Sequence, residues 1–311
     1  MRRYLDKIAV LQLIYLLAVV VFGAYVRATG AGAGCGNHWP LCNGTVIPHS
    51  PSVKTLIEYA HRLSSGLTLP LSLILFVLIK KYAPELKKAR FAALWTIFFI
   101  IMEGLLGAGL VYFEHVADNT SIYRALSMSL HLVNTFILMA FATFTWFQLA
   151  YESGLQVKTH SSRKKISFFL YSGIGVIFLV GITGAITALG DTIFPVKGAG
   201  EALRLGLNRT EHLIVQLRIY HPFIAVFAAS YLIFIARKLS GYFSHVRLWT
   251  LLLTVLLVAQ LLLGYFNVRL FAPVWLQLSH LLFAELIWIV FMIVYRSFSD
   301  SFPVSARRSL S

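Results

Sequence analysis

Charged residues are scarce in this sequence, and acidic residues are the scarcest of them. Only 13% of the 311 residues are Asp, Glu, Lys or Arg, about half of the roughly 25% found in soluble domains. With 58% hydrophobic residues and a mean hydropathy of +0.77, this shortage excludes a soluble globular enzyme. The net charge of +15 does not predict a nucleic-acid partner, because so apolar a chain has little surface for a basic face. The basic residues therefore belong in loops at a lipid membrane surface.

Eight apolar runs have about the 20 residues that a bilayer core requires. Because lipid cannot satisfy backbone N–H and C=O groups, each run should be helical, and the alternation of a lipid-facing barrel strand is absent. The sequence thus predicts an all-α membrane protein with eight transmembrane helices. The expected spans are 9–27, 56–79, 91–112, 124–149, 166–189, 212–235, 247–268 and 274–295.

Basic residues concentrate on one side of these spans. Eighteen of the 27 Lys and Arg residues lie in the terminal segments and in the loops after the even-numbered spans. By the positive-inside rule, the chain lies in the cell membrane with both termini cytoplasmic. The first outward loop holds the only two cysteines, Cys35 and Cys42. An oxidising compartment permits a disulfide there, either as a loop staple or as a redox-active pair.

The two halves of the sequence repeat one pattern of four spans. Glu103 in the third span aligns with Gln260 in the seventh, and each even-numbered span carries a histidine. The alignment of Glu103 with Gln260 suggests an interhelical hydrogen bond. Because each repeat has an even number of spans, the two copies share one topology. We expect two tandem, pseudo-symmetric four-helix bundles, residues 1–152 and 153–311.

Four histidines lie at a similar depth near the outer boundary of the hydrocarbon. His61, His131, His221 and His280 are about 24–32 Å from the cytoplasmic ends of their spans. One such histidine would equally fit an interhelical hydrogen bond, but a matched set marks a functional site. Zinc would need further ligands, whereas two histidines on facing helices fit the axial positions of a haem iron. No C-x-x-C-H motif is present, so we predict two non-covalent haem sites, His61 with His131 and His221 with His280.

The residue three positions before a histidine differs between the halves. Glu58 precedes His61, and Arg218 precedes His221, a spacing that places each side chain near a haem edge. Arg218 is predicted to anchor haem propionates. A carboxylate would repel propionates, so Glu58 is predicted to move a proton or stabilise positive charge, the alternative being an ion pair with Arg62. The first half would then act on a substrate, while the second would hold a permanent redox haem.

Three segments and the region around His280 resemble haem A synthases of the Gram-positive bacterial type. The segments are residues 57–62 (IEYAHR), 35–42 (CGNHWPLC) and 188–195 (ALGDTIFP), and the resemblance spans nearly the whole chain. It implies an oxidoreductase that converts a methyl substituent of haem O to the formyl group of haem A, for a terminal cytochrome oxidase.

The resemblance also implies residue roles and a partner. His61 and His131 would ligate the substrate haem O, and His221 and His280 would ligate haem b as cofactor. Glu58 would be the catalytic carboxylate, and Cys35 and Cys42 would form a functional disulfide. The implied partner is haem O synthase, the protohaem farnesyltransferase that makes the substrate.

Two other functions fit parts of the pattern. A quinol-linked electron-transfer cytochrome with two bis-histidine haems would need the four histidines but would have no use for Glu58. A haem or small-solute transporter would fit the duplication, although no span is obviously broken at the midplane.

Overall fold

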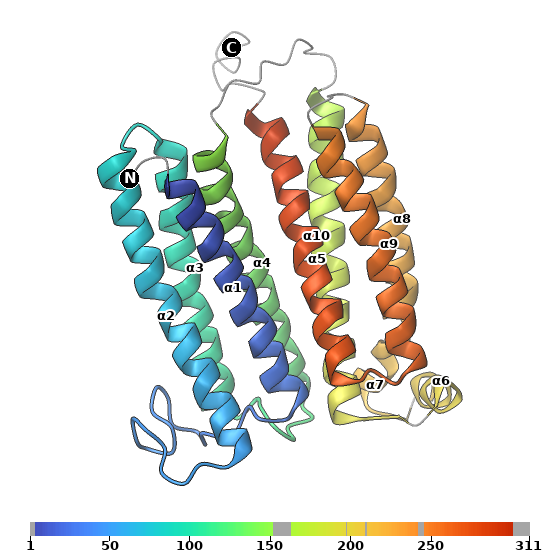
Figure 1. The fold of residues 1–311 in the computed structure, drawn as a ribbon. Helices are drawn as coiled ribbons and strands as arrows, with labels where there is room; N and C mark the ends of the chain where they lie inside the picture. Colours follow the sequence, from blue (N-terminus) through green and yellow to red (C-terminus); the bar gives the residue numbers. More distant parts are fainter. Residues whose placement is uncertain (1–3, 152–162, 197, 209, 242–245, 301–311) are drawn as a thin grey trace, which may run out of the picture.

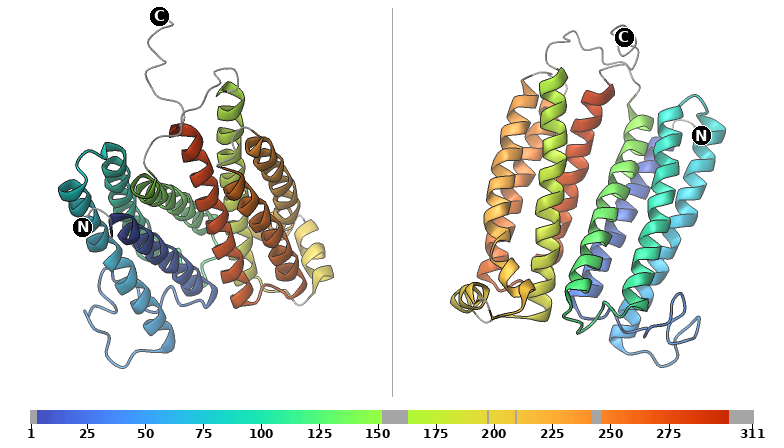
Figure 2. Two further views of the ribbon diagram at one scale, coloured as in Figure 1. Left: turned by 45° about the horizontal axis from the view of Figure 1, so that its top comes forward. Right: turned by 180° about the vertical axis from the view of Figure 1, so that it is seen from behind.

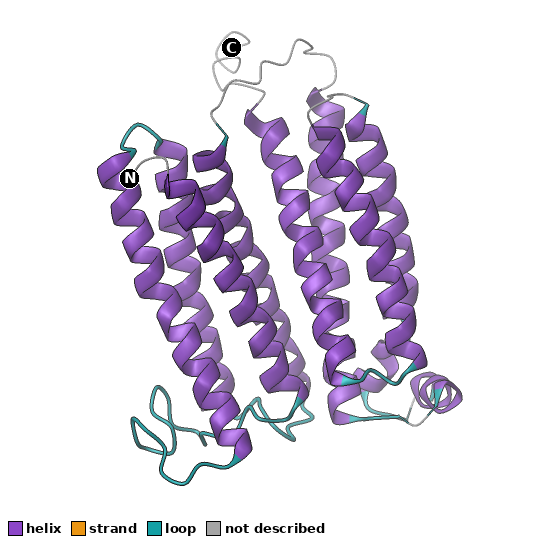
Figure 3. Cartoon of the chain, viewed as in Figure 1, coloured by secondary structure: helices purple, strands orange, loops and turns teal. Residues whose placement is uncertain are grey.

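The computed structural model describes residues 4–151, 163–196, 198–208, 210–241 and 246–300. Helices and loops make up this part of the chain, and no strand is present in it (Figure 3). The helices are α1 (Leu5–Ala28), α2 (Val53–Tyr82), α3 (Lys87–Tyr112), α4 (Ile122–Ala150), α5 (Arg163–Ile193), α6 (Ala199–Leu207), α7 (Leu213–Arg218), α8 (His221–Ser240), α9 (Arg247–Arg269) and α10 (Val274–Asp300).

The helices form two four-helix groups that stand side by side (Figure 1). One group contains α1 to α4, and the other contains α5, α8, α9 and α10 (Figure 2). Within the described residues, eight spans are long and apolar enough to cross a membrane, so the predicted fold class is confirmed and the protein is a multi-pass membrane protein. The predicted boundary at residues 152 and 153, and both termini, lie outside the described residues.

Helices α4 and α10 form the centre of the molecule. Half of the most apolar stretch of each is buried, against 17–28% in the other six spans. Phe136 of α4 packs against Trp288 of α10 with 5.5 Å between ring centroids. The Trp288 indole N–H also donates to the Phe136 carbonyl oxygen at 2.6 Å. One continuous apolar core therefore joins the two groups.

A second connection between the groups lies at the end of α1. Arg27 donates to the Ala188 carbonyl at 2.7 Å and to the Thr192 hydroxyl at 2.6 Å, both on α5. It also donates to Gln277 Oε1 on α10 at 2.9 Å. Three hydrogen bonds from one guanidinium thus tie the first group to two helices of the second, close to the ends that carry the predicted site residues.

The sixth span is not one continuous helix, which corrects the sequence prediction. It consists of α7 and α8, with the break between Arg218 and His221. Pro222 explains the break, because its ring has no N–H and would clash with the carbonyl of residue 218 in a continuous helix. The backbone of Ile219 and Tyr220 nevertheless stays in the right-handed helical region, so the one-turn relation between Arg218 and His221 stays a prediction. The preceding loop also contains the short helix α6, which a search for long apolar runs does not detect.

Candidate functional site

The four histidines lie near one end of the helix bundle, and each packs against a glycine of the preceding span. An ideal Cβ at Gly23 would lie 3.1 Å from His61 Cε1, and one at Gly107 would lie 3.7 Å from His131 Nε2. In the second half, the corresponding distances are 3.1 Å from Gly184 to His221 Cε1 and 3.3 Å from Gly264 to His280 Cε1. The missing side chains allow the imidazoles to approach the neighbouring helices. We call these four pairs the His–Gly contacts.

The His–Gly contacts were not predicted from the sequence, although a signal was present. Each odd-numbered span carries a glycine close to its outer end, namely Gly23, Gly107, Gly184 and Gly264. Glycine is common in transmembrane helices because it lets neighbouring helices approach, so a single glycine indicates nothing about a ligand. Its recurrence in all four helix pairs, each time against a histidine, extends the internal repeat from the spans to the site.

In each predicted pair, the two histidines lie close enough to interact electrostatically, His61 with His131 and His280 with His221. All four side chains are half-buried, and the Nδ1 atoms of His61 and His280 are buried without a hydrogen-bond partner. In the described part of the chain, no group of three or more His, Cys, Asp and Glu side chains is placed to hold a metal ion. Each pair is thus a two-ligand donor set, which fits a metal that brings its own equatorial ligands, as haem iron does.

Glu103 and Gln260 both contact a histidine of the following span. Glu103 Oε1 lies 2.8 Å from His131 Nδ1, and the Gln260 side-chain amide lies 3.2 Å from His280 Nε2. Glu103 also accepts hydrogen bonds from Asn134 and Thr135 of α4. The predicted interhelical hydrogen bond of Glu103 is therefore confirmed, and in both halves this position contacts the histidine of the following span, although through different ring nitrogens.

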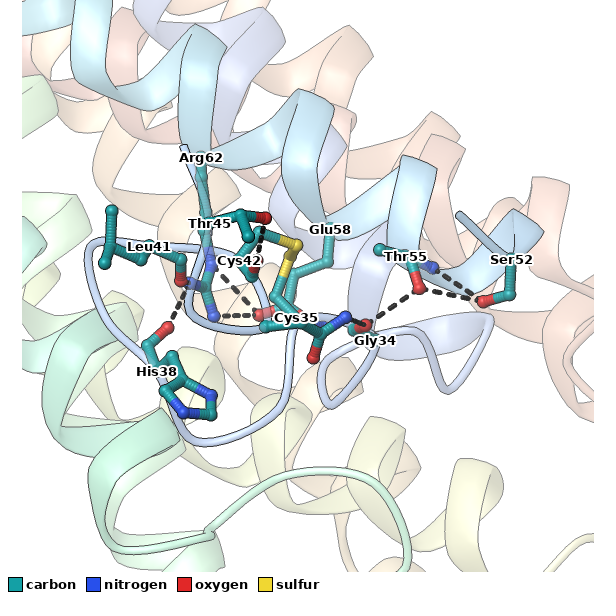
Figure 4. Close-up of a disulfide and its surroundings, with 11 residues drawn as sticks. Gly34, Cys35, His38, Leu41, Cys42, Thr45, Ser52, Thr55, Glu58 and Arg62 are labelled. Atoms are coloured by element: carbon teal, nitrogen blue, oxygen red, sulfur yellow. Dashed lines mark hydrogen bonds and ion pairs between the residues drawn. A yellow bond between two sulfur atoms is a disulfide. The ribbon is translucent and has the colours of Figure 1, made fainter. Parts of the chain in front are cut away.

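Glu58 is held between Arg62 and the first outer loop (Figure 4). Its Oε2 accepts a hydrogen bond from the Cys35 backbone N–H at 2.8 Å. Its Oε1 lies 2.5 Å from Arg62 Nη2. Arg62 also donates to the carbonyl oxygens of His38 and Leu41, each at 2.6 Å. The ion pair that the sequence offered as the alternative role is thus present, and both Glu58 oxygens face fixed donors one turn before His61.

The predicted disulfide joins Cys35 and Cys42 within this loop. Both cysteines are buried, and their Cα atoms are 4.4 Å apart. The loop also packs on the start of α2, where the Thr55 hydroxyl donates to the Gly34 carbonyl at 2.8 Å. Because the neighbouring backbone N–H of Cys35 binds Glu58, the disulfide fixes one of the donors to that carboxylate.

Arg218 has unused hydrogen-bonding capacity in the second half. It is only 6% exposed, and its Nη1 donates to the Phe194 carbonyl at 2.9 Å and approaches Asp191 Oδ1 at 3.4 Å. Its Nε and Nη2 are buried without a partner. Buried donors of this kind are rarely left unsatisfied, and two of them on one guanidinium fit the two oxygens of a carboxylate. This geometry is suitable for a haem propionate even though α7 ends before His221.

Comparison with known proteins agrees with the predicted family. Residues 6–292 match the family described as cytochrome oxidase assembly protein, COX15-CtaA. The chain is 29% identical to a heme A synthase of Bacillus pumilus, over 74% of this chain and 75% of that protein. It is 31% identical to a heme A synthase of Bacillus cereus, over 60% of this chain and 58% of that protein. The resemblance inferred from the sequence is thereby confirmed.

A longer relative has a different name. The chain is 42% identical over 292 residues to a protoheme IX farnesyltransferase of Thermus thermophilus. The matched region covers 92% of this chain but 47% of that protein. The chain thus spans about half the length of this relative.

Proposed function

The chain belongs to the family of cytochrome oxidase assembly proteins, and we propose that it oxidises a methyl substituent of haem O to a formyl group, giving haem A for a terminal cytochrome oxidase. Its heme A synthase relatives support a role in haem A formation. The observation that carries the proposal is the pair of two-histidine sites, each built on the same His–Gly contacts. One site would take the substrate and the other a resident cofactor.

The reaction sets the tasks of the protein. When water supplies the oxygen, conversion of a methyl to a formyl group releases four electrons and four protons, and the electrons pass to an oxidant outside the chain. The protein must therefore fix the porphyrin, accept protons beside the reacting carbon and provide a route for electrons. A site within a membrane bundle also suits haem O, because its long isoprenoid tail is apolar.

The histidine pairs divide between substrate and cofactor. We assign His61 and His131 to the iron of haem O, and His221 and His280 to the iron of haem b. Haem b supplies one-electron redox chemistry when it is bound. Arg218 supports its assignment to the second half, because its two unpartnered donors can hold a propionate. These roles make the chain an oxidoreductase.

Glu58 is assigned as the proton acceptor of the substrate half. It is 4% exposed and lies one turn before His61 on α2. Its pairing with Arg62 offsets the cost of a buried charge, while the Cys35 N–H orients the second oxygen. A proton released at the reacting carbon, or from an attacking water, would pass to this carboxylate. In this assignment the ion pair with Arg62 is a support for the catalytic role.

The longer relative supports a link to the enzyme that makes the substrate. A protein that contains a region 42% identical to this chain is named protoheme IX farnesyltransferase. We propose that haem O synthase, the protohaem farnesyltransferase, delivers haem O to this chain within the cell membrane. Direct transfer would keep the apolar substrate out of water.

The reaction is tested by supplying haem O to membranes that contain the protein and analysing the extracted haems by mass. We expect the formyl product to appear. Haem O that stays unchanged while both sites hold haem would instead favour the two-haem electron-transfer cytochrome.

The role of Glu58 is tested by a pair of variants in the same assay. Glu58→Gln should lower turnover by about 100-fold or more, because general acid–base groups contribute about 10²–10⁴, while both sites still bind haem. Arg62→Gln removes the ion pair but keeps the carboxylate, so it should retain more activity. Equal losses in the two variants would show that Glu58 acts only by holding the loop.

A further inference from the structure

Glu103 and Gln260 occupy equivalent places in the two halves, but they differ in charge. Each lies four residues before the glycine of a His–Gly contact, Gly107 for Glu103 and Gly264 for Gln260. Each contacts the histidine of the following span. The proposed reaction gives neither residue a role. The duplicated scaffold therefore presents a carboxyl group to one half and an amide to the other at the same position.

The Glu103 side chain binds the ring atom of His131 that points away from the glycine. Its Oε1 lies 2.8 Å from Nδ1, while Nε2 is the His131 atom nearest to Gly107. The Thr135 hydroxyl donates to the same oxygen at 2.5 Å, and Asn134 donates to Oε2. These neighbours on α4 hold the carboxyl group in place. With Nδ1 engaged, Nε2 is the atom left for a ligand.

The contact in the second half has the opposite arrangement. The Gln260 amide lies beside Nε2 of His280 at 3.2 Å, while His280 Nδ1 is buried and has no hydrogen-bond partner. The His221 ring is hydrogen-bonded through Nδ1 to the Thr183 hydroxyl at 3.1 Å. In the described residues, no carboxylate therefore accepts a hydrogen bond from either histidine of this pair. A carboxylate thus contacts His131 of the first pair, whereas neutral groups contact His221 and His280.

We propose that Glu103 is a positioning residue that holds His131 through Nδ1 and strengthens its Nε2 as an iron ligand. This inference rests on the proposed assignment of His61 and His131 to a haem. A carboxylate on the outer nitrogen of a ligating histidine raises the basicity of that ligand. A more basic ligand favours ferric iron, so the first site should have a lower midpoint potential than it would with an amide. The difference between Glu103 and Gln260 favours transfer of one electron from the first site, which is oxidised, to the second, which is reduced.

The test is a redox titration of the full chain in a His221→Ala background, loaded with haem O under anaerobic conditions, so that only the first site holds haem. Glu103→Gln copies the second half and should shift the ferric-to-ferrous preference at least tenfold toward ferrous iron. For a one-electron couple this shift is an increase of about 59 mV. The low-spin spectrum of a bis-histidine haem should persist.

Glu285→Gln is the matched control, because it removes another carboxyl group from a membrane-spanning helix, α10 of the second four-helix group. Glu285 is fully buried on α10, and neither of its oxygens has a hydrogen-bond partner in the described residues. In Glu285→Gln, the ferric-to-ferrous preference should shift by less than threefold. Bound haem with an unchanged potential in Glu103→Gln, or an equal shift in both variants, would overturn the inference.

A second variant covers the case in which Glu103→Gln fails to retain haem. Thr135→Val keeps the carboxylate and removes one donor to Oε1, which should make Glu103 a stronger acceptor and shift the potential downward. No downward shift would overturn the inference. If the parent His221→Ala protein binds no haem O at all, the failure belongs to the proposed function and not to Glu103.

Discussion

The two halves share one histidine–glycine scaffold but differ in the groups that surround it. In the first half, a disulfide-closed loop covers the start of α2 and holds Glu58 through Cys35 and Arg62. In the second half, α6 and α7 occupy the corresponding end, and Arg218 presents two unpaired donors. The histidine and glycine positions are thus alike in the two halves, while the surrounding charge differs. Under the proposed function, the shared scaffold sets where each haem would bind, and the surrounding groups set the chemistry of each site.

The largest effect is expected from the removal of one histidine of a pair. His221→Ala should abolish the low-spin haem b spectrum and reduce haem content to one site, because the pair loses an axial ligand. The spectrum of purified protein prepared without haem O provides the measurement.

His212→Ala is the matched control for this variant. His212 caps α7 by accepting a hydrogen bond from the Ile214 N–H, and no interaction pairs it with His221 or His280 in the described residues. Its haem content should stay unchanged. A normal haem b spectrum in His221→Ala would show that the pairs are wrongly assigned.

The fold was predictable because the bilayer restricts the possibilities. A chain in lipid must satisfy its backbone within each helix, so long apolar runs such as α9 and α10 define the architecture directly. The break before His221 was harder to predict, since proline is tolerated within transmembrane helices, as Pro70 is within α2. Helix α6 was missed for a different reason: it is short and carries Glu201 and Arg204, so it does not resemble a span.

The site was predictable where depth and repetition carried the signal. The proximity of the paired histidines and the hydrogen bonds of Glu103 followed from positions along the spans, while the haem-ligand roles stay predictions. The packing of His61 on Gly23 depends on how two helices face each other, which one span alone does not encode. The hydrogen bond from the Cys35 N–H to Glu58 depends on the path of a loop, and a loop has no periodic sequence pattern from which its path could be predicted.

A smaller effect is expected from the arginine that distinguishes the second half. Arg218→Gln should weaken haem b binding about 10- to 100-fold, because hydrogen bonds to a charged group contribute about 1.5–3 kcal/mol. Haem titration of the apoprotein measures the affinity. Arg204→Gln, on the exposed surface of α6, is the control and should bind haem normally. Equal haem affinities in the two variants would show that Arg218 does not contribute to haem binding.

The smallest effect is expected from the disulfide that distinguishes the first half. Cys35→Ser should lower stability by about 2–4 kcal/mol, as loss of a cross-link typically does, and thermal unfolding with and without reductant measures the change. Turnover should fall only a few-fold, because the Cys35 N–H remains available to Glu58 even when the loop is looser. Wild-type protein under reducing conditions should behave like the variant. A complete loss of turnover with unchanged unfolding would instead identify the pair as redox-active, and the first half would then contribute electrons as well as a proton acceptor.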